Sequence, residues 1–443
     1  MAQVSLTDPS LTIIIATTPL GLGHLRVTDA LYHGLPRNAS PILLGARSDS
    51  TSGLYRFISN HVITRNLMEI SQLPPFERPV AYVWRKILRS QIKGLAQSVK
   101  TVLSERFVVS QTIVMVATQP VHGHQLGAIK EKLSQELGAK IILVVQVTDD
   151  SPQYMWYVSE ADCIFVPSVY TKEHLETYAR KARLPHVPIV VTAYPVSPLL
   201  TEELSEHAFS KKLEQVSPVA QTAINMTVPV SGAAVGMGYT LRYIDALHRK
   251  SSRFLFHVVS KEAPYTRSFI EKMTNTPYVM LHTSIHDRTT VANYEEVFTQ
   301  TPIALEITKP SEQAFKALIP PKDRGGVIML LAKPVGRQEY DNLHFLKNHG
   351  FMPHERENEH LWKQAQTQQS IDPELFEKAY HWRALLLPED PSYAAVFTQW
   401  CLQERLFERM MKYKRLMSGV EVQPNGVDQF WAHVTKLVAS SRV

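Results

Sequence analysis

The chain has 443 residues, 44% of them hydrophobic and 20% charged, and its 47 Lys and Arg against 41 Asp and Glu give a formal net charge of +6. This length favours two or three domains, and the composition is that of a folded soluble protein. The basic excess is too small to indicate nucleic-acid binding, although it suits an anionic ligand or a membrane surface. With only Cys163 and Cys401 present and no paired spacing, we expect neither a disulfide framework nor a structural zinc site, which favours a reducing cytosol.

The sequence shows no sign of a membrane-spanning or secreted protein. No apolar run approaches the ~20 residues that a membrane helix needs. The N-terminus has neither the charged region nor the cleavage site of a signal peptide. We therefore expect a cytoplasmic protein that can contact the inner face of a membrane peripherally without spanning it.

The first half of the chain alternates short apolar runs with longer amphipathic stretches. The short runs are rich in Val and Ile and are bounded by turn residues, as buried strands are. Helical patterns cover 25–35, 85–103 and 124–136. Alternating strands and helices predict a mostly parallel sheet with helices on both faces. The predicted strands are 12–16, 40–44, 112–117, 141–147, 163–166 and 188–192.

The alternation breaks near Pro195 and Pro198, where a charged stretch follows, and this predicts a domain junction. It restarts with five further strands and ends in a polar stretch over 353–369 and a long helical pattern over 392–417. These strands are predicted at 227–230, 254–259, 279–282, 303–307 and 327–331. We therefore expect an N-terminal domain over 1–200, a second domain over 201–352, and a charged connector with a helical extension over 353–443.

Two glycine-containing turns follow strands, one in each half. The first contains Gly21, Gly23 and His24, and the second contains Gly232, Gly236, Met237 and Gly238. A strand, a glycine turn and a helix together leave backbone N–H groups and a positive helix end facing a ligand, which suits phosphate. Each turn alone is equally readable as a tight connection without a ligand. The pair predicts an α/β protein with two Rossmann-like domains facing across a cleft.

Polar side chains follow several strands of the first half. His24 stands where a helix should begin, and a neutral imidazole there can take a proton from a hydroxyl nucleophile, or it can simply cap the helix. Asp149 and Asp150 follow the strand 141–147, and either one orients His24 or binds an acceptor hydroxyl, or the segment forms an ordinary turn. His122 and His124 also follow a strand, but no carboxylate or thiol lies near them in sequence, so we expect no metal site.

The second half repeats this pattern. Polar side chains again follow two strands: Lys309 and Glu312 follow the strand 303–307, and Gln338, Glu339 and Asn342 follow the strand 327–331. Carboxylates accept hydrogen bonds from ribose hydroxyls, amides bond sugar hydroxyls, and a glycine loop can hold a diphosphate. The alternative for 338–342 is the solvated start of a helix.

A stretch over 82–93 mixes aromatic, apolar and basic residues at helical spacing. Trp84, Arg85, Lys86 and Arg89 give it the character of an interfacial helix that contacts a membrane or a lipid acceptor. The alternative is an amphipathic core helix with a basic solvent face.

Together these motifs resemble GT-B glycosyltransferases of family 28, which include monogalactosyldiacylglycerol synthases and diacylglycerol glucosyltransferases. The turn at 21–24 resembles the family's Gly-x-Gly-His, and Thr148-Asp149 with Trp156 resembles its Thr-Asp turn and following aromatic residue. The segment 191–196 resembles the Thr-Gly-Ile-Pro-Val that ends its first domain. Three further segments resemble motifs of the family's second domain. Residues 232–238 resemble its glycine loop, and residues 307–310 resemble the start of its Thr-Lys-Pro-Gly-Gly motif. Residues 334–342 resemble its Pro-x-Pro-Gly-Gln-Glu-x-x-Asn motif.

The chain departs from the family pattern in its donor signature. Ser311-Glu312 stands where the family has two glycines, and Phe315-Lys316 stands where it has Ser-Glu. The family's ribose-binding glutamate is therefore lost or displaced to Glu312. A pocket with Lys316 in place of that carboxylate is expected to bind a different donor or none.

The resemblance implies inverting transfer of a sugar from a nucleotide-diphosphate donor, a UDP-sugar acting as co-substrate, to a hydroxyl acceptor such as a lipid, with no further cofactor and no metal. His24 would be the base, assisted by Asp149, and the second-half residues would hold the donor. Two alternatives stay open. One is a non-catalytic nucleotide-sugar-binding scaffold that docks partners through Met410, Met411 and Tyr413, and the other is a UDP-sugar 2-epimerase.

Overall fold

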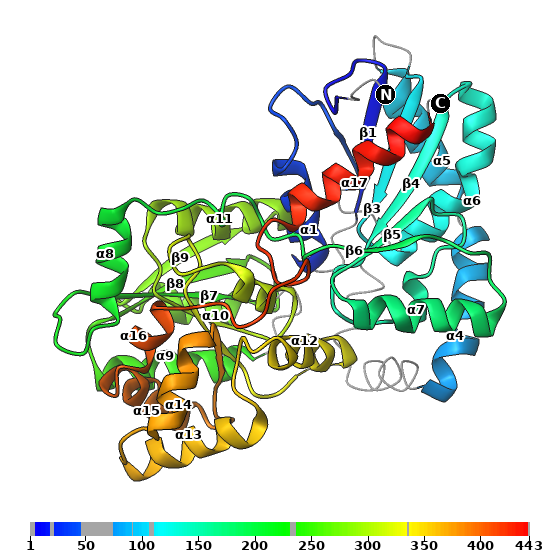
Figure 1. Ribbon diagram of the computed structural model, residues 1–443. Helices are drawn as coiled ribbons and strands as arrows, with labels where there is room; N and C mark the ends of the chain where they lie inside the picture. The colour runs from blue at the N-terminus through cyan, green and yellow to red at the C-terminus, as the bar shows by residue number, and fades with distance from the viewer. Residues whose placement is uncertain are drawn as a thin grey trace. The chain divides into compact units, whose positions relative to one another are not determined.

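The computed structural model describes residues 5–17, 22–45, 74–90, 92–105, 110–230, 236–334 and 336–441. These residues form two compact units (Figure 1). Unit 1 contains the chain up to Pro198 and the segment from Asn425 onward, and unit 2 contains Leu199–Pro424. Both units are α/β, so the predicted pair of Rossmann-like domains is confirmed, while the cleft between them stays a prediction.

Unit 1 is built on a six-stranded parallel sheet in the order β2-β1-β3-β4-β5-β6. β1 and β3 consist entirely of buried residues, because helices cover both faces of the sheet. The chain runs from β1 to β2 in one direction and from β3 to β6 in the other, so the order reverses between β1 and β3. The strands are β1 (Leu11–Ala16), β2 (Ile42–Leu44), β3 (Thr112–Ala117), β4 (Lys140–Gln146), β5 (Cys163–Val166) and β6 (Ile189–Val191).

The described helices of unit 1 follow their strands and include the last helix of the chain. They are α1 (Leu22–His33), α4 (Pro74–Ser90), α5 (Lys93–Ser104), α6 (Pro120–Leu137), the short 3₁₀ helix η1 (Tyr154–Trp156), α7 (Val169–Ala182) and α17 (Gly426–Ser441). The helix predicted over 85–103 is two helices, α4 and α5. Within the described ranges, no helix is long and apolar enough to cross a membrane.

α17 packs on unit 1, although it lies at the far end of the sequence (Figure 1). The indole N–H of Trp431 donates to the Leu31 carbonyl at 2.9 Å, and the Gln429 side-chain oxygen accepts from the Ala193 N–H at 2.9 Å. A side chain at Gly426 would place its Cβ 2.3 Å from the Ala193 oxygen, so this close approach requires glycine. The end of the chain therefore completes unit 1, which differs from the expected extension over 353–443.

Unit 2 is built on a second six-stranded parallel sheet in the order β12-β11-β10-β7-β8-β9. Counted within the unit, this is the doubly wound 3-2-1-4-5-6 order, and it reverses between β7 and β10. The strands are β7 (Ile224–Pro229), β8 (Phe254–Lys261), β9 (Val279–Ser284), β10 (Leu305–Thr308), β11 (Val327–Leu330) and β12 (Ala384–Leu386). β12 was not among the predicted strands.

The helices of unit 2 extend well beyond residue 352. They are α8 (Glu206–Gln215), α9 (Met237–Lys250), α10 (Arg267–Thr274), α11 (Asp287–Gln300), η2 (Glu312–Leu318), α12 (Arg337–Asn348), α13 (Glu355–Thr367), α14 (Pro373–Lys378), η3 (Ala379–His381), α15 (Pro391–Gln403) and α16 (Leu406–Met411). The polar stretch expected to be a connector is largely α13, and its Leu361 and Ala365 are buried in the unit 2 core.

The long helix predicted over 392–417 is interrupted at Arg405, which adopts a φ of 60° and separates α15 from α16. A left-handed residue cannot continue an α-helix. Met410 and Met411 are buried in the core cluster of unit 2. They are therefore core residues, and the expectation that they dock a partner is wrong.

Candidate functional site

The surroundings of His24 lie where the strand order of unit 1 reverses. β1 and α1 flank the first glycine turn, and His24 falls in the first turn of α1, directly after Gly23. The Thr148 hydroxyl, just beyond the carboxyl end of β4, is hydrogen-bonded to His24 Nδ1 at 3.0 Å. The Trp156 ring lies nearby, with its centroid 6.2 Å from that of the imidazole. Open α/β sheets bind ligands at this kind of position.

Thr148 is itself held firmly. Its side chain is buried, and the Tyr194 hydroxyl donates to the Thr148 carbonyl at 3.0 Å. The imidazole of His24 is therefore oriented by a chain of contacts that runs from Tyr194 to Thr148. Sequence reasoning assigned the orienting role to Asp149, and the adjacent Thr148 was quoted only as part of a motif.

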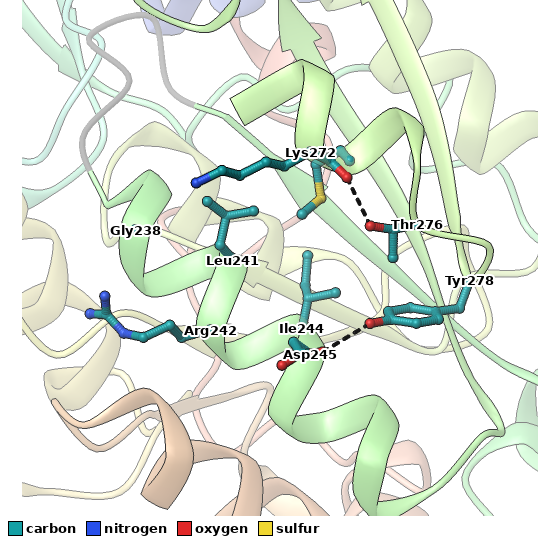
Figure 2. Close-up of a pocket in the computed structure, with 9 residues that line it drawn as sticks. Gly238, Leu241, Arg242, Ile244, Asp245, Lys272, Thr276 and Tyr278 are labelled. Atoms are coloured by element: carbon teal, nitrogen blue, oxygen red, sulfur yellow. Dashed lines mark hydrogen bonds between the residues drawn. The ribbon is translucent and has the colours of Figure 1, made fainter. Parts of the chain in front are cut away.

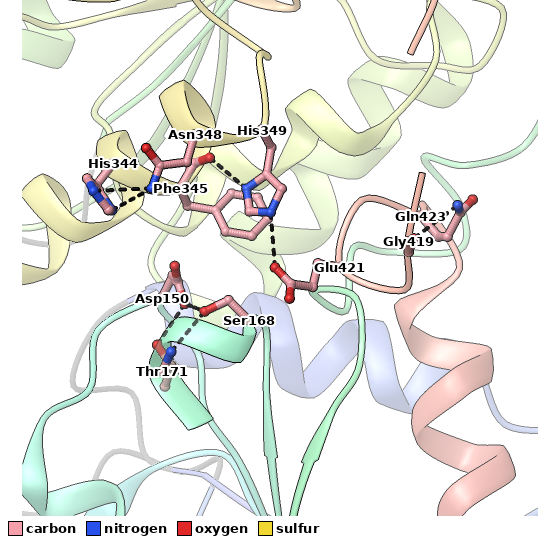
Figure 3. Close-up of polar contacts among 10 residues, drawn as sticks. All are labelled: Asp150, Ser168, Thr171, His344, Phe345, Asn348, His349, Gly419, Glu421 and Gln423. Atoms are coloured by element: carbon pink, nitrogen blue, oxygen red, sulfur yellow. Dashed lines mark hydrogen bonds and ion pairs between the residues drawn. The ribbon is translucent and has the colours of Figure 1, made fainter. Parts of the chain in front are cut away.

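The two aspartates after β4 occupy different environments. Asp149 is half-buried beside Thr148 at the carboxyl end of the strand. Asp150 is buried and accepts hydrogen bonds from the Ser168 and Thr171 hydroxyls, the latter at 2.7 Å (Figure 3). Since Ser168 caps α7, Asp150 fixes the start of that helix. Of these two aspartates, only Asp149 remains a predicted catalytic residue.

His122 and His124 are two buried histidines on α6. Burial, with a contribution from nearby His24, lowers the pKa of His122 to about 4. Burial, with a contribution from Arg85, lowers the pKa of His124 to about 3, and one of its ring nitrogens is hydrogen-bonded to the Met155 carbonyl at 3.0 Å. Both imidazoles are therefore neutral at pH 7. A neutral neighbour adds no positive charge that would oppose proton uptake by His24.

The lowered pKa of His124 predicts acid sensitivity. The unfolded chain binds a proton near pH 6.5, whereas the folded protein does not until about pH 3, so stability is lost as the pH falls below 6.5. For His124→Gln, we expect the loss of unfolding free energy between pH 7 and pH 5 to be smaller than in the unmodified protein by about 2 kcal/mol. Denaturant titrations at both pH values measure this difference. Replacing the exposed His174 should leave the loss unchanged, and an equal loss in His124→Gln would contradict the assignment.

In unit 2 a small cavity of about 20 Å³ lies where the strand order reverses. Its described lining comes from the ends of β7 and β10 and from the first turn of α9: Val228, Pro229, Val230, Met237, Thr240, Ile307, Thr308, Lys309 and Leu331. Gly236 adopts a φ of 87°, which glycine reaches without strain, and directly precedes α9. The positive end of α9 therefore adjoins the cavity. Gly21 and Gly232, also predicted to bind phosphate, lie outside the described residues.

Residues from α12 pack onto the loop after β10. Lys309 forms an ion pair with Glu339, and both side chains are mostly buried. The Asn342 side-chain amide donates to the Pro310 carbonyl at 3.3 Å. The structure thus brings Glu339 and Asn342 to the loop that contains Lys309, about thirty residues earlier in the sequence. Because the Glu339 carboxylate is paired with the Lys309 ammonium group, it holds Lys309 at the cavity.

The other described residues that were predicted to bind the donor lie in the first turns of η2, α12 and α9. Glu312 begins η2, and Gln338 lies in the first turn of α12; both are half-buried. Gly238 lies in the first turn of α9 and is exposed. Binding of a nucleotide-sugar by these residues stays a prediction.

Lys316, which replaces the family's glutamate, has its own place in the core. Its ammonium group forms an ion pair with the buried Glu306 and lies 4.5 Å from the centre of the Tyr294 ring and 5.0 Å from that of Phe298. Glu306 also accepts hydrogen bonds from the Tyr294 hydroxyl at 3.1 Å and from the Gly326 N–H at 2.9 Å. Lys316 is absent from the described lining of the cavity. The substitution therefore builds a buried ion pair and does not put a cation into the predicted donor pocket.

A second, more open groove of about 450 Å³ begins at Gly238 and runs along α9 toward α10 (Figure 2). Arg242 and Lys272 extend into it from the two helices, and Leu241 lies between them (Figure 2). At its other end, the Tyr278 hydroxyl donates to Asp245 at 3.2 Å. The sequence analysis did not predict this groove: apart from Gly238, its lining belongs to no motif and comes from α9, α10 and the connection between α10 and β9.

α4 has one face on unit 1 and one face in solvent. Glu77 accepts a hydrogen bond from the Tyr154 N–H at 2.7 Å, and Arg85 donates to the Tyr154 carbonyl. Arg89 forms an ion pair with Glu160. The exposed face carries five large hydrophobic side chains and Lys86. These hydrophobic side chains are Phe76, Tyr82, Val83, Trp84 and Ile87, which are 40–58% exposed.

This arrangement divides the residues predicted to contact a membrane. Trp84 and Lys86 are exposed, as an interfacial role requires. Arg85 is buried over the Tyr178 ring and Arg89 is paired, so both anchor α4 to unit 1. The packing of the inner face therefore confirms the core-helix alternative, and contact of the outer face with a membrane stays a prediction.

No protein-family model and no curated protein matches this sequence. Among solved structures, it is similar to UDP-GlcNAc 2-epimerase from Neisseria meningitidis bound to UDP-GlcNAc, with a TM-score of 0.48, 11% identity, and coverage of 96% of this chain and 98% of that one. It is also similar to S. aureus MnaA with UDP (TM-score 0.47, 10% identity, coverage 97% and 96%). A third is Medicago truncatula UGT71G1 complexed with UDP-glucose (TM-score 0.43, 11% identity, coverage 98% and 100%). Similarity at this level establishes neither an activity nor a ligand.

Proposed function

We propose that this protein is an inverting glycosyltransferase that moves a sugar from a UDP-sugar to the hydroxyl group of a lipid acceptor. Unit 2 would bind the donor and unit 1 the acceptor. The proposal rests on the motif resemblance and on the placement of the motif residues at the carboxyl edges of two parallel sheets.

One observation carries the proposal. Lys309 and Met237, which belong to different motifs, line the same cavity at the point where the strand order of unit 2 reverses. Glu339 and Asn342, from a third motif, hold the Lys309 loop in place. Convergence of three separated motifs at a doubly wound switch point is what nucleotide binding requires. The positive end of α9 and the Lys309 ammonium would stabilise the negative charge of the departing diphosphate.

In unit 1, His24 would remove the proton from the acceptor hydroxyl. In the tautomer that a base requires, Nδ1 carries the hydrogen and donates it to Thr148 Oγ1, which leaves the lone pair on Nε2 for the acceptor. The new bond forms between the acceptor oxygen and the sugar's anomeric carbon as the bond to the diphosphate breaks. Attack from the face opposite the leaving group inverts the anomeric centre.

A lipid acceptor suits the structure of α4. Its inner face holds Tyr154 through Glu77 and Arg85, and Tyr154 begins η1, which carries Trp156 beside His24. Its outer face exposes aromatic and aliphatic side chains together with Lys86, which suits the interface of an anionic membrane. One helix would therefore bring a membrane-embedded hydroxyl toward the base.

Calorimetric titration with UDP tests the donor site. We expect saturable binding, and we expect Gly236→Ala to weaken it about tenfold, because alanine is strained at a φ of 87° and displaces the start of α9. Gly138→Ala is the matched control, since Gly138 also has positive φ but lies in unit 1. Absence of UDP binding by the unmodified protein would contradict the proposal that it binds a nucleotide-sugar, whether as an enzyme or as a non-catalytic scaffold.

Flotation with vesicles containing phosphatidylglycerol tests the exposed face of α4. The triple substitution Tyr82→Ser, Val83→Ser, Ile87→Ser removes apolar area without touching the anchoring residues Glu77 and Arg85. We expect binding to fall about ten- to a hundredfold. Replacement of the exposed Ile285 of unit 2 by serine is the control. Unchanged flotation of the triple variant would remove the membrane role of α4.

A further inference from the structure

A loop in unit 2 displays a second apolar and basic surface, separate in sequence from α4. This loop, Lys412–Pro424, joins α16 to α17, and we call Leu416–Val420 its tip. Leu416 is 58% exposed, Met417 is 43% exposed and Val420 is 49% exposed. Three large hydrophobic side chains are thus exposed within five residues of one loop.

The loop is firmly attached on both sides of its tip. Before the tip, the Lys414 N–H donates to the Tyr380 carbonyl at 2.8 Å, and its carbonyl is hydrogen-bonded to His381 at 2.6 Å. After the tip, Glu421 lies 3.0 Å from His349 Nε2, and the Gln423 amide donates to the Gly419 carbonyl at 3.1 Å (Figure 3). The exposed side chains are therefore presented by a fixed support.

The charge around the tip is positive. Lys412 and Lys414 are exposed, and the structure records no ion pair for either within the described part of the chain. Arg415 adds a third cation, whose guanidinium donates to Gln423 at 3.0 Å and to the Leu318 carbonyl at 3.4 Å. The loop's one carboxylate, Glu421, is turned toward His349. An anionic partner is therefore favoured electrostatically.

We propose that the tip Leu416–Val420 inserts into the headgroup region of an anionic lipid membrane, with Lys412 and Lys414 contacting the lipid phosphates. A membrane accepts a small apolar tip without matched shape, and nearby lysines add attraction to anionic lipid. A second copy of the chain is disfavoured, because a stable dimer needs about 800 Å² per partner and like charges would face each other. The proposal concerns unit 2 and holds independently of sugar transfer.

A fluorescent label at the tip tests insertion directly. Val420→Cys is labelled with nitrobenzoxadiazole, and the native Cys163 and Cys401 do not compete because both are buried. With vesicles containing phosphatidylglycerol, we expect a blue-shifted, several-fold brighter emission that spin-labelled lipid quenches. The same label at Val219→Cys, an 82% exposed position of unit 2, should show neither change. An unshifted tip label on protein that floats with vesicles would overturn the proposal while leaving the role of α4 intact.

Two further measurements test the contribution of the two lysines to vesicle binding and the self-association of the protein through the tip. Lys412→Gln with Lys414→Gln, in the labelled Val420→Cys background, should weaken vesicle binding about fivefold per lysine. Unchanged binding would overturn the role given to the lysines. A blue shift that appears without vesicles and grows with protein concentration would assign the tip to self-association and overturn the proposal. UDP titration of the same variants should match the unmodified protein, so failure of the proposed donor site would be recognised separately.

Discussion

Replacing His24 by alanine is expected to lower the rate of sugar transfer by about 10²- to 10⁴-fold, the usual contribution of a general base. The reason is that His24 is the imidazole held at the switch point of unit 1, where Thr148 bonds its Nδ1. Affinity for UDP should not change, because the proposed donor cavity belongs to unit 2. Steady-state kinetics with UDP release as the readout, together with calorimetry, separate these two effects.

His33 offers a matched control on the same helix. It is exposed at the C-terminal end of α1, so His33→Ala should retain full activity. Equal thermal stability of the two variants would show that α1 is intact in both. Undiminished turnover of His24→Ala would eliminate His24 as the base.

Replacing Lys316 by methionine is expected to destabilise unit 2 by about 3–5 kcal/mol, because the buried Glu306 would lose the ammonium group that is paired with it. The double variant Lys316→Met with Glu306→Gln should recover most of this loss, since the amide oxygen of glutamine can still accept from the Gly326 N–H. Denaturant titration of both variants measures the recovery.

The same pair of variants tests whether the altered donor signature matters for binding. Because Lys316 packs against Tyr294 and Phe298, the stable double variant should bind UDP as the unmodified protein does. If Lys316→Met instead remained fully stable and lost UDP binding, Lys316 would be a donor-site residue and its assignment to the core would be incorrect.

The buried strands were the part of the fold most accessible to sequence reasoning. The runs around β1, β3, β4 and β5 are continuous, apolar and bounded by turns, and the predicted bounds differ from the observed ones by at most one residue. The placement of α17 was not accessible, because it depends on contacts such as Trp431 with Leu31, four hundred residues apart. Periodicity reports which face of a helix is buried, but not which domain it packs against.

The candidate site shows the same division. Spacing after strands correctly brought Lys309, Glu339 and Asn342 to one edge of a sheet, since parallel strands end together. The identity of individual partners was not predictable. The sequence offered Asp149 and Asp150 as equal candidates, and the structure shows that Asp150 instead bonds Ser168 and Thr171. Arg85 was predicted to contact a membrane, but its side chain lies on the face of α4 that packs on unit 1. Such assignments depend on side-chain direction, which a single sequence does not encode locally.

The measurement that tests the central claim most directly is incubation of the protein with a UDP-sugar and vesicles that contain diacylglycerol, followed by product analysis by mass spectrometry and nuclear magnetic resonance. A UDP-sugar with an α-linked donor group should yield free UDP and a β-linked glycolipid, and His24→Ala should yield neither. A UDP-sugar epimerised at C2 without an acceptor would contradict the account, as would a UDP-sugar that binds and stays unchanged with every hydroxylated lipid offered.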